Sequence, residues 1–260
     1  MTNPITPPLT FEPLNLETCR ANRQWCKKEI TKRLMLLLLE YTRSKPLPFM
    51  AHIEPFGPGP PRPPPQSAPE PSIYTIFSNI SDSVLRNTDK STWTLARDSA
   101  ASDAANDTAQ SYSFSAQAER PAALFYCARS FFDFDLSSIP ASKTIASATL
   151  SLTTTGPYAH TISIQKGTQN IPSTVNDFQA FTGALFLNKT TSIGLNIITL
   201  NAAAITYLQS VLISTAKLCV REYNFDYLDV APTALFGRVG LYYSDTPTDA
   251  DKPTLTITTD

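Results

Sequence analysis

The sequence predicts an all-β protein: an antiparallel β-sandwich of jelly-roll type with one short helix, preceded by an N-terminal helical arm and a proline-rich linker. Apolar and polar residues alternate at Phe132, Phe134 and Leu136 and again over residues 145–152. This is the period-two pattern of half-buried, paired strands. A break at residues 137–144 separates the two runs, so we expect two strands joined by a turn.

Proline content divides the chain near residue 72. The sequence has 22 prolines against only 8 glycines, and 15 of the prolines fall in residues 1–72. The same segment has nine Lys and Arg against six Asp and Glu, whereas the remainder has 12 against 16. Neither balance is strong enough to indicate a nucleic-acid-binding surface. We therefore expect an arm over residues 1–72 and a globular part over residues 73–260.

The N-terminus shows no basic segment followed by an apolar stretch, so no secretory signal is expected. The apolar run at residues 34–39 is far shorter than the roughly 20 residues of a membrane span. Synthesis in a cytoplasm without membrane insertion is the expectation, and cysteines there are normally reduced. Free thiols are therefore expected at Cys19, Cys26, Cys127 and Cys219, although a bridge between Cys127 and Cys219 stays open.

Residues 1–44 read as an extended tail followed by an amphipathic helix that begins after Asn15. Apolar residues recur at three-and-four spacing, and the expected docking residues are Ile30, Leu34, Leu37, Leu38 and Tyr41. This apolar stripe needs a partner, which is either another chain, including a second copy, or the protein's own β domain. Residues 45–72 favour polyproline II and predict a semi-rigid linker.

Strand patterns recur through the globular part, and residues 98–111, which are small and acidic, predict a loop. A helix is expected from Asn201, its N-cap, to Leu212. Nine or so strands in this length fit a two-sheet sandwich. The expected strands are 73–77, 112–116, 124–128, 130–136, 146–153, 161–165, 191–199, 215–221, 237–243 and 254–258.

Four separated motifs occur in a fixed order. They are D-S-V-x-R with W-x-x-x-R, then R-x-x-x-x-F-D-L-S-S-I-P-A, then T-I-x-S-A-T-L-S-L, and finally G-L-Y-Y-S-D-x-P-x-x-x-D-K-P-T-L-T-I-T. In this order, residues 73–260 resemble the DNRLRE-type jelly-roll domains of bacterial surface proteins and tailed-phage structural proteins. The resemblance implies that F-D-L-S-S-I-P is a central strand with its exit turn, that S-A-T-L-S-L is its neighbour, and that P-T-L-T-I closes the fold.

The resemblance implies a non-enzymatic structural component of a phage virion, such as a fibre, decoration or neck and tail protein. The sandwich would face outward, and the arm would bind other virion proteins after synthesis in the host cytoplasm. A homo-oligomer is expected. The alternative is a carbohydrate-binding or adhesion module of a bacterial surface protein or enzyme, because the fold is similar to such modules; a shared fold does not carry a shared ligand.

No catalytic residues are expected. The chain has only two histidines, His52 and His160, and no G-x-S-x-G motif precedes either of them. Asp133 and Asp135 lie two apart on one strand, about 7 Å from each other. A structural role is favoured for Asp135, which either accepts backbone N–H groups of the following turn or pairs with Arg129.

Two kinds of ligand site remain as candidates. Flat rings stack on sugars, and the candidate glycan contacts are Trp93, Tyr223, Tyr227, Tyr242 and Tyr243, which packing inside the sandwich would equally explain. Clustered acidic side chains suit calcium, and the weak candidates are Asp226, Asp229, Asp245, Asp249 and Asp251. Because neither acidic loop matches a calcium-loop pattern, solvated turns are the default and no cofactor is expected.

Overall fold

The structure is a computed structural model that describes residues 70–107, 110–155, 160–233 and 237–260. The chain divides into two units, Met1–Gln66 and Ser67–Asp260, and all described residues belong to the second unit. The predicted arm, with Cys19, Cys26 and the docking residues 30–41, lies outside the described residues. The predicted helix of the arm and its docking role therefore stay predictions.

The described part consists of strands with a few short helical segments. The strands are β1 (Ser72–Phe77), β2 (Ser83–Lys90), β3 (Ala104–Asn106), β4 (Ser111–Glu119), β5 (Phe125–Asp135), β6 (Ile145–Thr155), β7 (Thr161–Gly167), β8 (Phe181–Thr190), β9 (Gly194–Thr199), β10 (Thr215–Glu222), β11 (Arg238–Tyr242) and β12 (Thr254–Thr259). The helical segments are α3 (Trp93–Arg97), η1 (Val175–Asp177), α4 (Ala202–Ser210), the π-helical turn η2 (Tyr223–Tyr227) and η3 (Asp249–Asp251).

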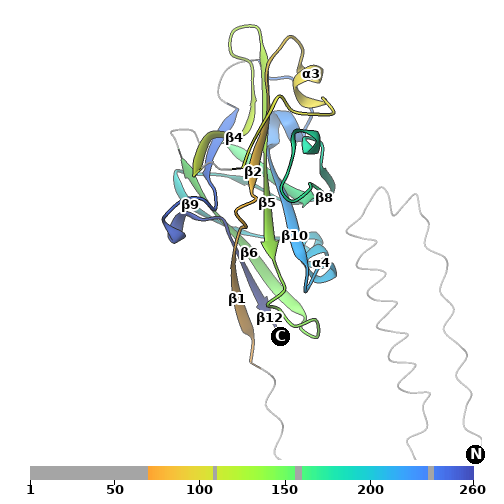
Figure 1. The fold of residues 1–260 in the computed structure, drawn as a ribbon, viewed down its shortest axis with the longest axis vertical. Coiled ribbons are helices and arrows are strands. Elements are labelled where there is room, and N and C mark those ends of the chain that lie inside the picture. Colours follow the sequence, from red (N-terminus) through yellow and green to blue (C-terminus); the bar gives the residue numbers. More distant parts are fainter. Residues whose placement is uncertain (1–69, 108–109, 156–159, 234–236) are drawn as a thin grey trace, which may run out of the picture. The chain divides into compact units, whose positions relative to one another are not determined.

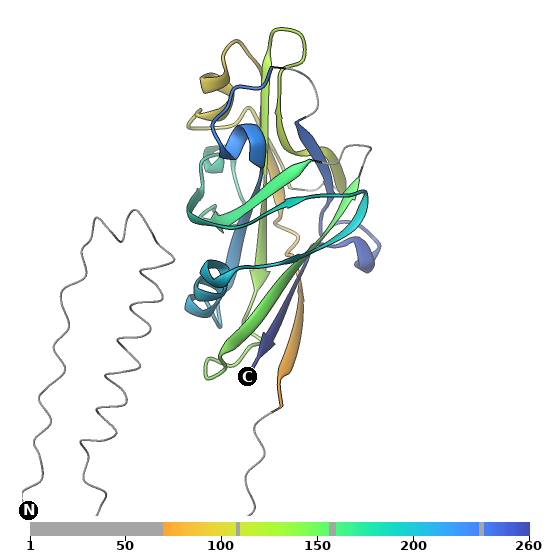
Figure 2. The ribbon, with the colours of Figure 1, turned by 180° about the vertical axis from the view of Figure 1, so that it is seen from behind.

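The strands form one curled antiparallel sheet (Figures 1 and 2). Its order is β1-β12-β6-β11-β4-β5-β10-β7-β8, while β2 pairs with β3 and β5, and β9 pairs with β6. The curl brings residues from both ends of this order into one apolar core, to which Ile76 of β1 and Phe186 of β8 both belong. The predicted all-β, sandwich-like fold is confirmed.

The long strand β5 joins the two halves of the sheet and runs through the middle of the view in Figure 1. It pairs with β2 over residues 125–131, with β4 over residues 126–128 and with β10 over residues 130–135. The middle of β5 therefore lies between two partner strands, at residues 127–128 and again at 130–131. This makes the strand a stable base for side chains that must be positioned accurately.

Both faces of β5 are buried, in contrast to the half-buried strand that the alternation predicts. Phe132 and Phe134 belong to the main core, whereas Cys127 and Phe131 belong to a second apolar cluster. Trp93 of α3 and Phe178 of the segment before β8 complete this second cluster. The half-buried prediction is wrong here because these two segments cover the face that would otherwise meet solvent.

Several strand predictions need correction. The segments 124–128 and 130–136 form the single strand β5, and the predicted loop at 98–111 contains β3 and the start of β4. Strands β2 and β8 were not predicted. The resemblance also implied that the S-A-T-L-S-L segment lies next to the F-D-L-S-S-I-P strand, which is wrong, since β6 pairs with β12, β11 and β9 rather than with β5.

The predicted helix after Asn201 is confirmed as α4, which packs on the main core through Leu208. The Asn201 side chain caps it: its Oδ1 accepts a hydrogen bond from Ala204 N at 3.1 Å, and its Nδ2 donates to Leu185 O at 2.9 Å. The residue therefore links the helix start to β8 as well as capping it.

Replacing Asn201 with alanine should lower the free energy of unfolding by about 1–2 kcal/mol, because it removes both the cap and the bond to β8. Asn201→Asp keeps the capping oxygen and loses only the donor, so a smaller loss is expected. Urea unfolding followed by intrinsic fluorescence measures both changes. Equal losses for the two variants would contradict a capping role.

Candidate functional site

Two arginines and one aspartate form a buried ionic cluster on the face of β5 that meets the second apolar cluster. Arg129 of β5 donates from Nε and Nη2 to the two carboxylate oxygens of Asp226, at 2.9 and 2.8 Å. Arg221 of β10 does the same, at 3.0 and 2.9 Å. All three side chains are buried. Two bidentate pairs on one carboxylate fix its position from two neighbouring strands.

Both guanidinium groups also donate to other segments. Arg129 Nη1 donates to Phe178 O and its Nη2 to Arg97 O, each at 2.9 Å. Arg221 Nη1 donates to Gln165 Oε1 at 2.9 Å. The cluster therefore connects β5 and β10 to α3, to β7 and to the segment before β8.

Aromatic rings cover the two guanidinium groups. Arg129 lies 4.2 Å from the ring centroid of Phe178 and 4.8 Å from that of Phe181, and Arg221 lies 4.1 Å from the centroid of Phe181. Cation–π contacts of this kind gain strength away from water. They partly offset the cost of burying two positive charges beside a single negative one.

Asp226 reaches this position because it lies in the π-helical turn η2, directly after β10. The buried Glu222 caps that turn, with its carboxylate oxygens accepting hydrogen bonds from Asn224 N at 3.0 Å and Phe225 N at 2.6 Å. Arg97 of α3 adds a bond from Nε to Asp226 O at 2.9 Å. The turn is thus held at its start by Glu222 and at Asp226 by three arginines.

The electrostatics of the cluster favour a structural role. Burial by itself would raise the pKa of the Asp226 carboxyl, but the charges of Arg129 and Arg221 outweigh it and hold that pKa far below its usual range. Burial raises the pKa of the Cys219 thiol to about 12 and that of the Cys127 thiol further still. Both cysteines are free, so the free-thiol prediction is confirmed for this pair.

Asp226 therefore stays ionised, and neither thiol forms the thiolate that nucleophilic chemistry requires. No member of the cluster is both exposed and poised to exchange a proton. What the arrangement can do is fix α3 and η2 rigidly against the sheet.

Of the two roles predicted for Asp135, the turn contact is confirmed and the pairing with Arg129 is wrong. Asp135 plays the turn-stabilising role that was one of its two predicted functions, accepting a hydrogen bond from Ser137 N at 2.9 Å, but Arg129 binds Asp226 instead. Asp133 is buried and accepts from Ser81 Oγ at 3.0 and 3.1 Å. A charged residue inside an apolar run, such as Arg221 in L-C-V-R-E, indicates a buried charge that needs a partner of opposite charge. This pattern could have predicted a carboxylate near Arg221.

The candidate glycan residues are not brought together as one set. Trp93 and Tyr243 are buried in two different core clusters, so they offer no ring to a ligand. Tyr242 is half-buried on β11. Tyr223 and Tyr227 are half-buried on η2 and stack on each other, with ring centroids 5.4 Å apart and planes inclined by 13°. Tyr223, Tyr227 and Tyr242 are thus the members of the set that reach the surface. The Arg221 guanidinium lies 5.8 Å from the centroid of the Tyr227 ring, so the ionic cluster also contacts the stacked pair.

The calcium candidates are likewise occupied or dispersed. Asp226 is held by arginines, Asp229 lies 3.3 Å from Arg97, and Asp249 pairs with Lys252 at 2.7 Å. Among the described residues, no group of three or more His, Cys, Asp or Glu side chains is placed to hold a metal ion.

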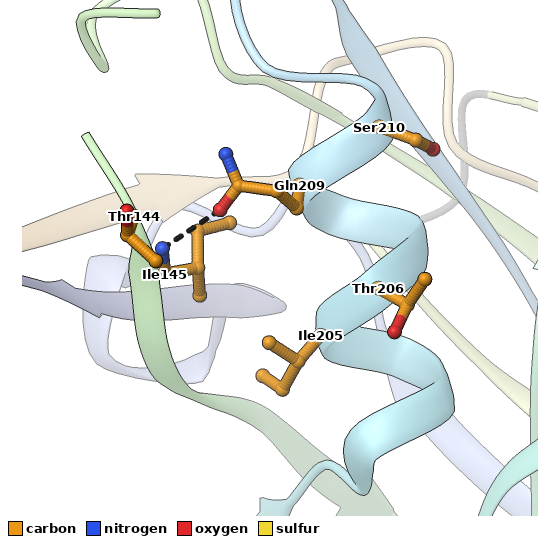
Figure 3. Close-up of a pocket in the computed structure, with 6 residues that line it drawn as sticks. All are labelled: Thr144, Ile145, Ile205, Thr206, Gln209 and Ser210. Atoms are coloured by element: carbon orange, nitrogen blue, oxygen red, sulfur yellow. Dashed lines mark hydrogen bonds between the residues drawn. The ribbon is translucent and has the colours of Figure 1, made fainter. Parts of the chain in front are cut away.

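A pocket of about 380 Å³ lies between the start of β6 and α4 (Figure 3). Gln209 bridges its walls, since its Oε1 accepts from Ile145 N at 2.8 Å and its Nε2 donates to Lys143 O at 3.1 Å. The Thr206 and Ser210 hydroxyls donate to carbonyls of their own helix. The lining has no charged side chain, so the pocket suits an apolar group and provides no acid–base chemistry.

A smaller pocket of about 190 Å³ opens between β2, β4 and β11. Its charged residues are Arg86, Glu119 and Arg238, and Arg238 lies 3.6 Å from the Glu119 carboxylate. Gln117 Nε2 also donates to Glu119, at 2.6 Å. These contacts stabilise the buried Glu119.

Another buried carboxylate, Asp82, lies directly before β2. Asp82 accepts hydrogen bonds from Ser78 Oγ at 2.7 Å and from Ser244 N and Oγ at 2.9 and 2.8 Å. No arginine or lysine pairs with it among the described contacts. Burial raises its pKa to about 6 despite these hydrogen bonds. Local sequence patterns do not indicate this site, because Ser244 is 162 residues away.

No protein-family model matches this sequence, and no curated protein matches it either. None of the helices in the described ranges is long and apolar enough to cross a membrane.

Proposed function

We propose that the protein is a non-enzymatic structural component of a phage virion: a fibre, decoration or neck and tail protein. Its β-sandwich, with a jelly-roll-type strand order, faces outward, and the N-terminal arm anchors it to other virion proteins. The sequence motifs that resemble phage structural domains motivate this proposal.

One observation supports the non-enzymatic part of the proposal: the charged groups of the ionic cluster are buried and bind one another. The most strongly perturbed charged groups of a protein are normally the first candidates for catalysis. Here Arg129, Arg221 and Asp226 are buried, bind one another and tie surface segments to the sheet. Such a cluster supports a rigid module that presents its surface, which is what a particle protein needs.

Mass spectrometry of purified particles tests the proposal. Particles from the source culture are purified on a density gradient, and the chain is quantified against the major capsid protein. A constant ratio across the particle fractions is expected. If the chain stays in the soluble fractions while the capsid protein sediments, the virion role is excluded.

A second candidate function, glycan binding, is favoured by the stacked pair of Tyr223 and Tyr227. Both rings are half-buried and reach the surface, and aromatic rings bind the apolar faces of sugars. A glycan array probed with the full chain tests this function, with Tyr223→Ala and Tyr227→Ala as variants. Tyr242→Ala, on another strand, is the matched control. Selective binding that only the first two variants abolish would support the carbohydrate-binding alternative.

A further inference from the structure

The outward face of strands β1, β12, β6 and β9 forms a regular array without charged side chains. Cross-strand neighbours in an antiparallel sheet point to the same side. One row across the four strands is Phe77, Thr254, Ser151 and Ile197.

The next row is Thr75, Thr256, Thr149 and Thr199, and Ile73, Thr258 and Ser147 begin a third. We call these three rows, with Leu195 on β9, the threonine face. Its centre, on β12 and β6, consists only of Thr and Ser.

Large apolar side chains stand at both edges of the threonine face and are exposed. On β1, Ile73 is 70% exposed and Phe77 44%; on β9, Leu195 is 56% exposed and Ile197 62%. Among the described residues, two lysines lie next to the ends of the face: the Lys252 ammonium is 5.9 Å from the Phe77 ring, and Lys143 Nζ donates to Ser72 Oγ.

This pattern differs from that of an ordinary solvated sheet. Solvent-facing surfaces of soluble domains normally carry about 25–35% charged residues. Edge strands usually carry a lysine, a proline or a bulge that prevents association. Among the described strands, β1 pairs only with β12 and β9 only with β6, so both are edge strands that expose apolar side chains instead.

We propose that the threonine face binds the same face of a second copy of this chain. The two copies are related by a two-fold axis that runs parallel to the strands. The β9 edge of each copy then lies on the β1 edge of its partner, so that Ile197 meets Phe77. The Thr and Ser side chains of β6 and β12 meet at the centre.

Charge and symmetry identify the second copy as the occupant. In the proposed arrangement, β1 of one copy meets β9 of the other, and β12 meets β6. A charged side chain in these rows would be buried in the contact without a partner. A face without charges avoids this cost. Both edges of the face are apolar and its centre is polar. When one copy is rotated about an axis along the strands, apolar edge therefore meets apolar edge and polar centre meets polar centre. Aligned packing of two sheets is a common arrangement.

The size of the face sets the strength of the contact. Four strands spaced about 4.8 Å apart and three rows of alternate residues cover roughly 20 Å by 20 Å, or about 400 Å² on each copy. Stable dimers bury about 1,200 Å² or more in total. The threonine face by itself therefore gives a weak, concentration-dependent association, which becomes effective when several copies are held close together.

Sedimentation velocity of the full chain over a range of concentrations tests the proposal with two variants and their mixture. Ile197→Lys places a cation against Phe77 and Lys252 of the partner, and Phe77→Glu places a carboxylate against Ile197. Each variant alone should raise the dissociation constant at least about 100-fold, because the unpaired charge occurs twice in a symmetric dimer.

Mixing the two variants should restore association. In the mixed dimer, the lysine introduced on β9 of one chain meets the glutamate introduced on β1 of the other, and the second edge keeps its native contact. Leu95→Lys is the matched control, since Leu95 is 53% exposed on α3, away from the threonine face, and it should leave the dissociation constant unchanged.

Any association through other parts of the chain is common to all samples, so differences between them report on the threonine face. A wild-type sedimentation coefficient that is independent of concentration, or single variants that associate like the wild type, would overturn the proposal. A mixture that fails to associate although each single variant is folded would overturn the proposed arrangement. The proposal does not depend on the virion role, because self-association is measured without particles.

Discussion

Replacing Asp226 with alanine is expected to lower the free energy of unfolding by about 4 kcal/mol or more, since it leaves two buried guanidinium groups without their carboxylate. Arg129 and Arg221 lie in the central strands β5 and β10, so neither side chain can move into solvent without breaking the sheet. Urea unfolding monitored by circular dichroism measures the loss. A variant that does not fold at all fits the same expectation.

Asp229→Ala is the matched control for this prediction. Asp229 also lies near an arginine, 3.3 Å from Arg97, but its side chain is 60% exposed. Exposed ion pairs contribute about 0–1 kcal/mol. A triple variant, Arg129→Met, Arg221→Met and Asp226→Leu, separates ion pairing from packing, because apolar replacement of a whole buried cluster is often tolerated. If Asp226→Ala were no more harmful than Asp229→Ala, the cluster would not stabilise the fold.

Asp82 is expected to make the protein less stable as the pH rises from 4 to 7. Its pKa is about 6 in the folded state against an ordinary value of 3.8. The folded protein therefore binds more protons than the unfolded chain in this window. This stabilising contribution is fully present below pH 3.8 and is lost as the pH passes 6. At about 1.4 kcal/mol per pH unit, the total change is about 2–3 kcal/mol.

Asp82→Asn removes this titration and isolates its contribution. Burial also raises the pKa of Glu222, which gives a slope of the same sign, so the informative quantity is the difference between the two proteins. Free energies of unfolding are measured at pH 4, 5, 6 and 7. The value for Asp82→Asn minus the value for the wild type should increase towards pH 7. Asp226 has the opposite sign, because its folded pKa is lowered, so both proteins should lose stability below pH 4. A difference between the two proteins that does not change with pH would contradict a raised pKa for Asp82.

Local patterns in the sequence predicted the fold class and most of the strands. The alternation at residues 145–152 became β6, with Leu150 and Leu152 in the core, and the cap at Asn201 marked the start of α4. Such features depend on residues close in the chain, and a sequence displays them directly.

The strands that sequence reasoning missed lack this alternation. In β8, most side chains are exposed and only Phe186 is buried, so an edge strand shows little apolar pattern. In β2, Arg86 and Asn87 interrupt the apolar run, and Asn87 is buried because Ala96 O accepts its side-chain hydrogen bond.

The ionic cluster could be predicted only in part. Arg129 was recognised as a structural residue, but Asp226 is 97 residues away. Asp135, only six residues from Arg129 in the sequence, was the more obvious partner. The choice depends on how β5 and β10 pair and on the turn that Glu222 caps, and both are tertiary features. The same holds for the threonine face, which exists only once β1, β12, β6 and β9 lie side by side in register.

The pairing of β1 with β12 also determines how the domain responds to force. Ser72 lies opposite Thr259, so the N-terminal end of β1 is next to the C-terminal end of β12, and Figure 1 shows the two strands side by side. A load applied between the N-terminal end of β1 and the C-terminus would separate these two strands one hydrogen bond at a time, starting at Ser72, rather than shear the whole ladder at once. Strand β1 is therefore expected to peel away from β12 before β5 separates from its neighbours, because β1 has one partner strand and β5 has three.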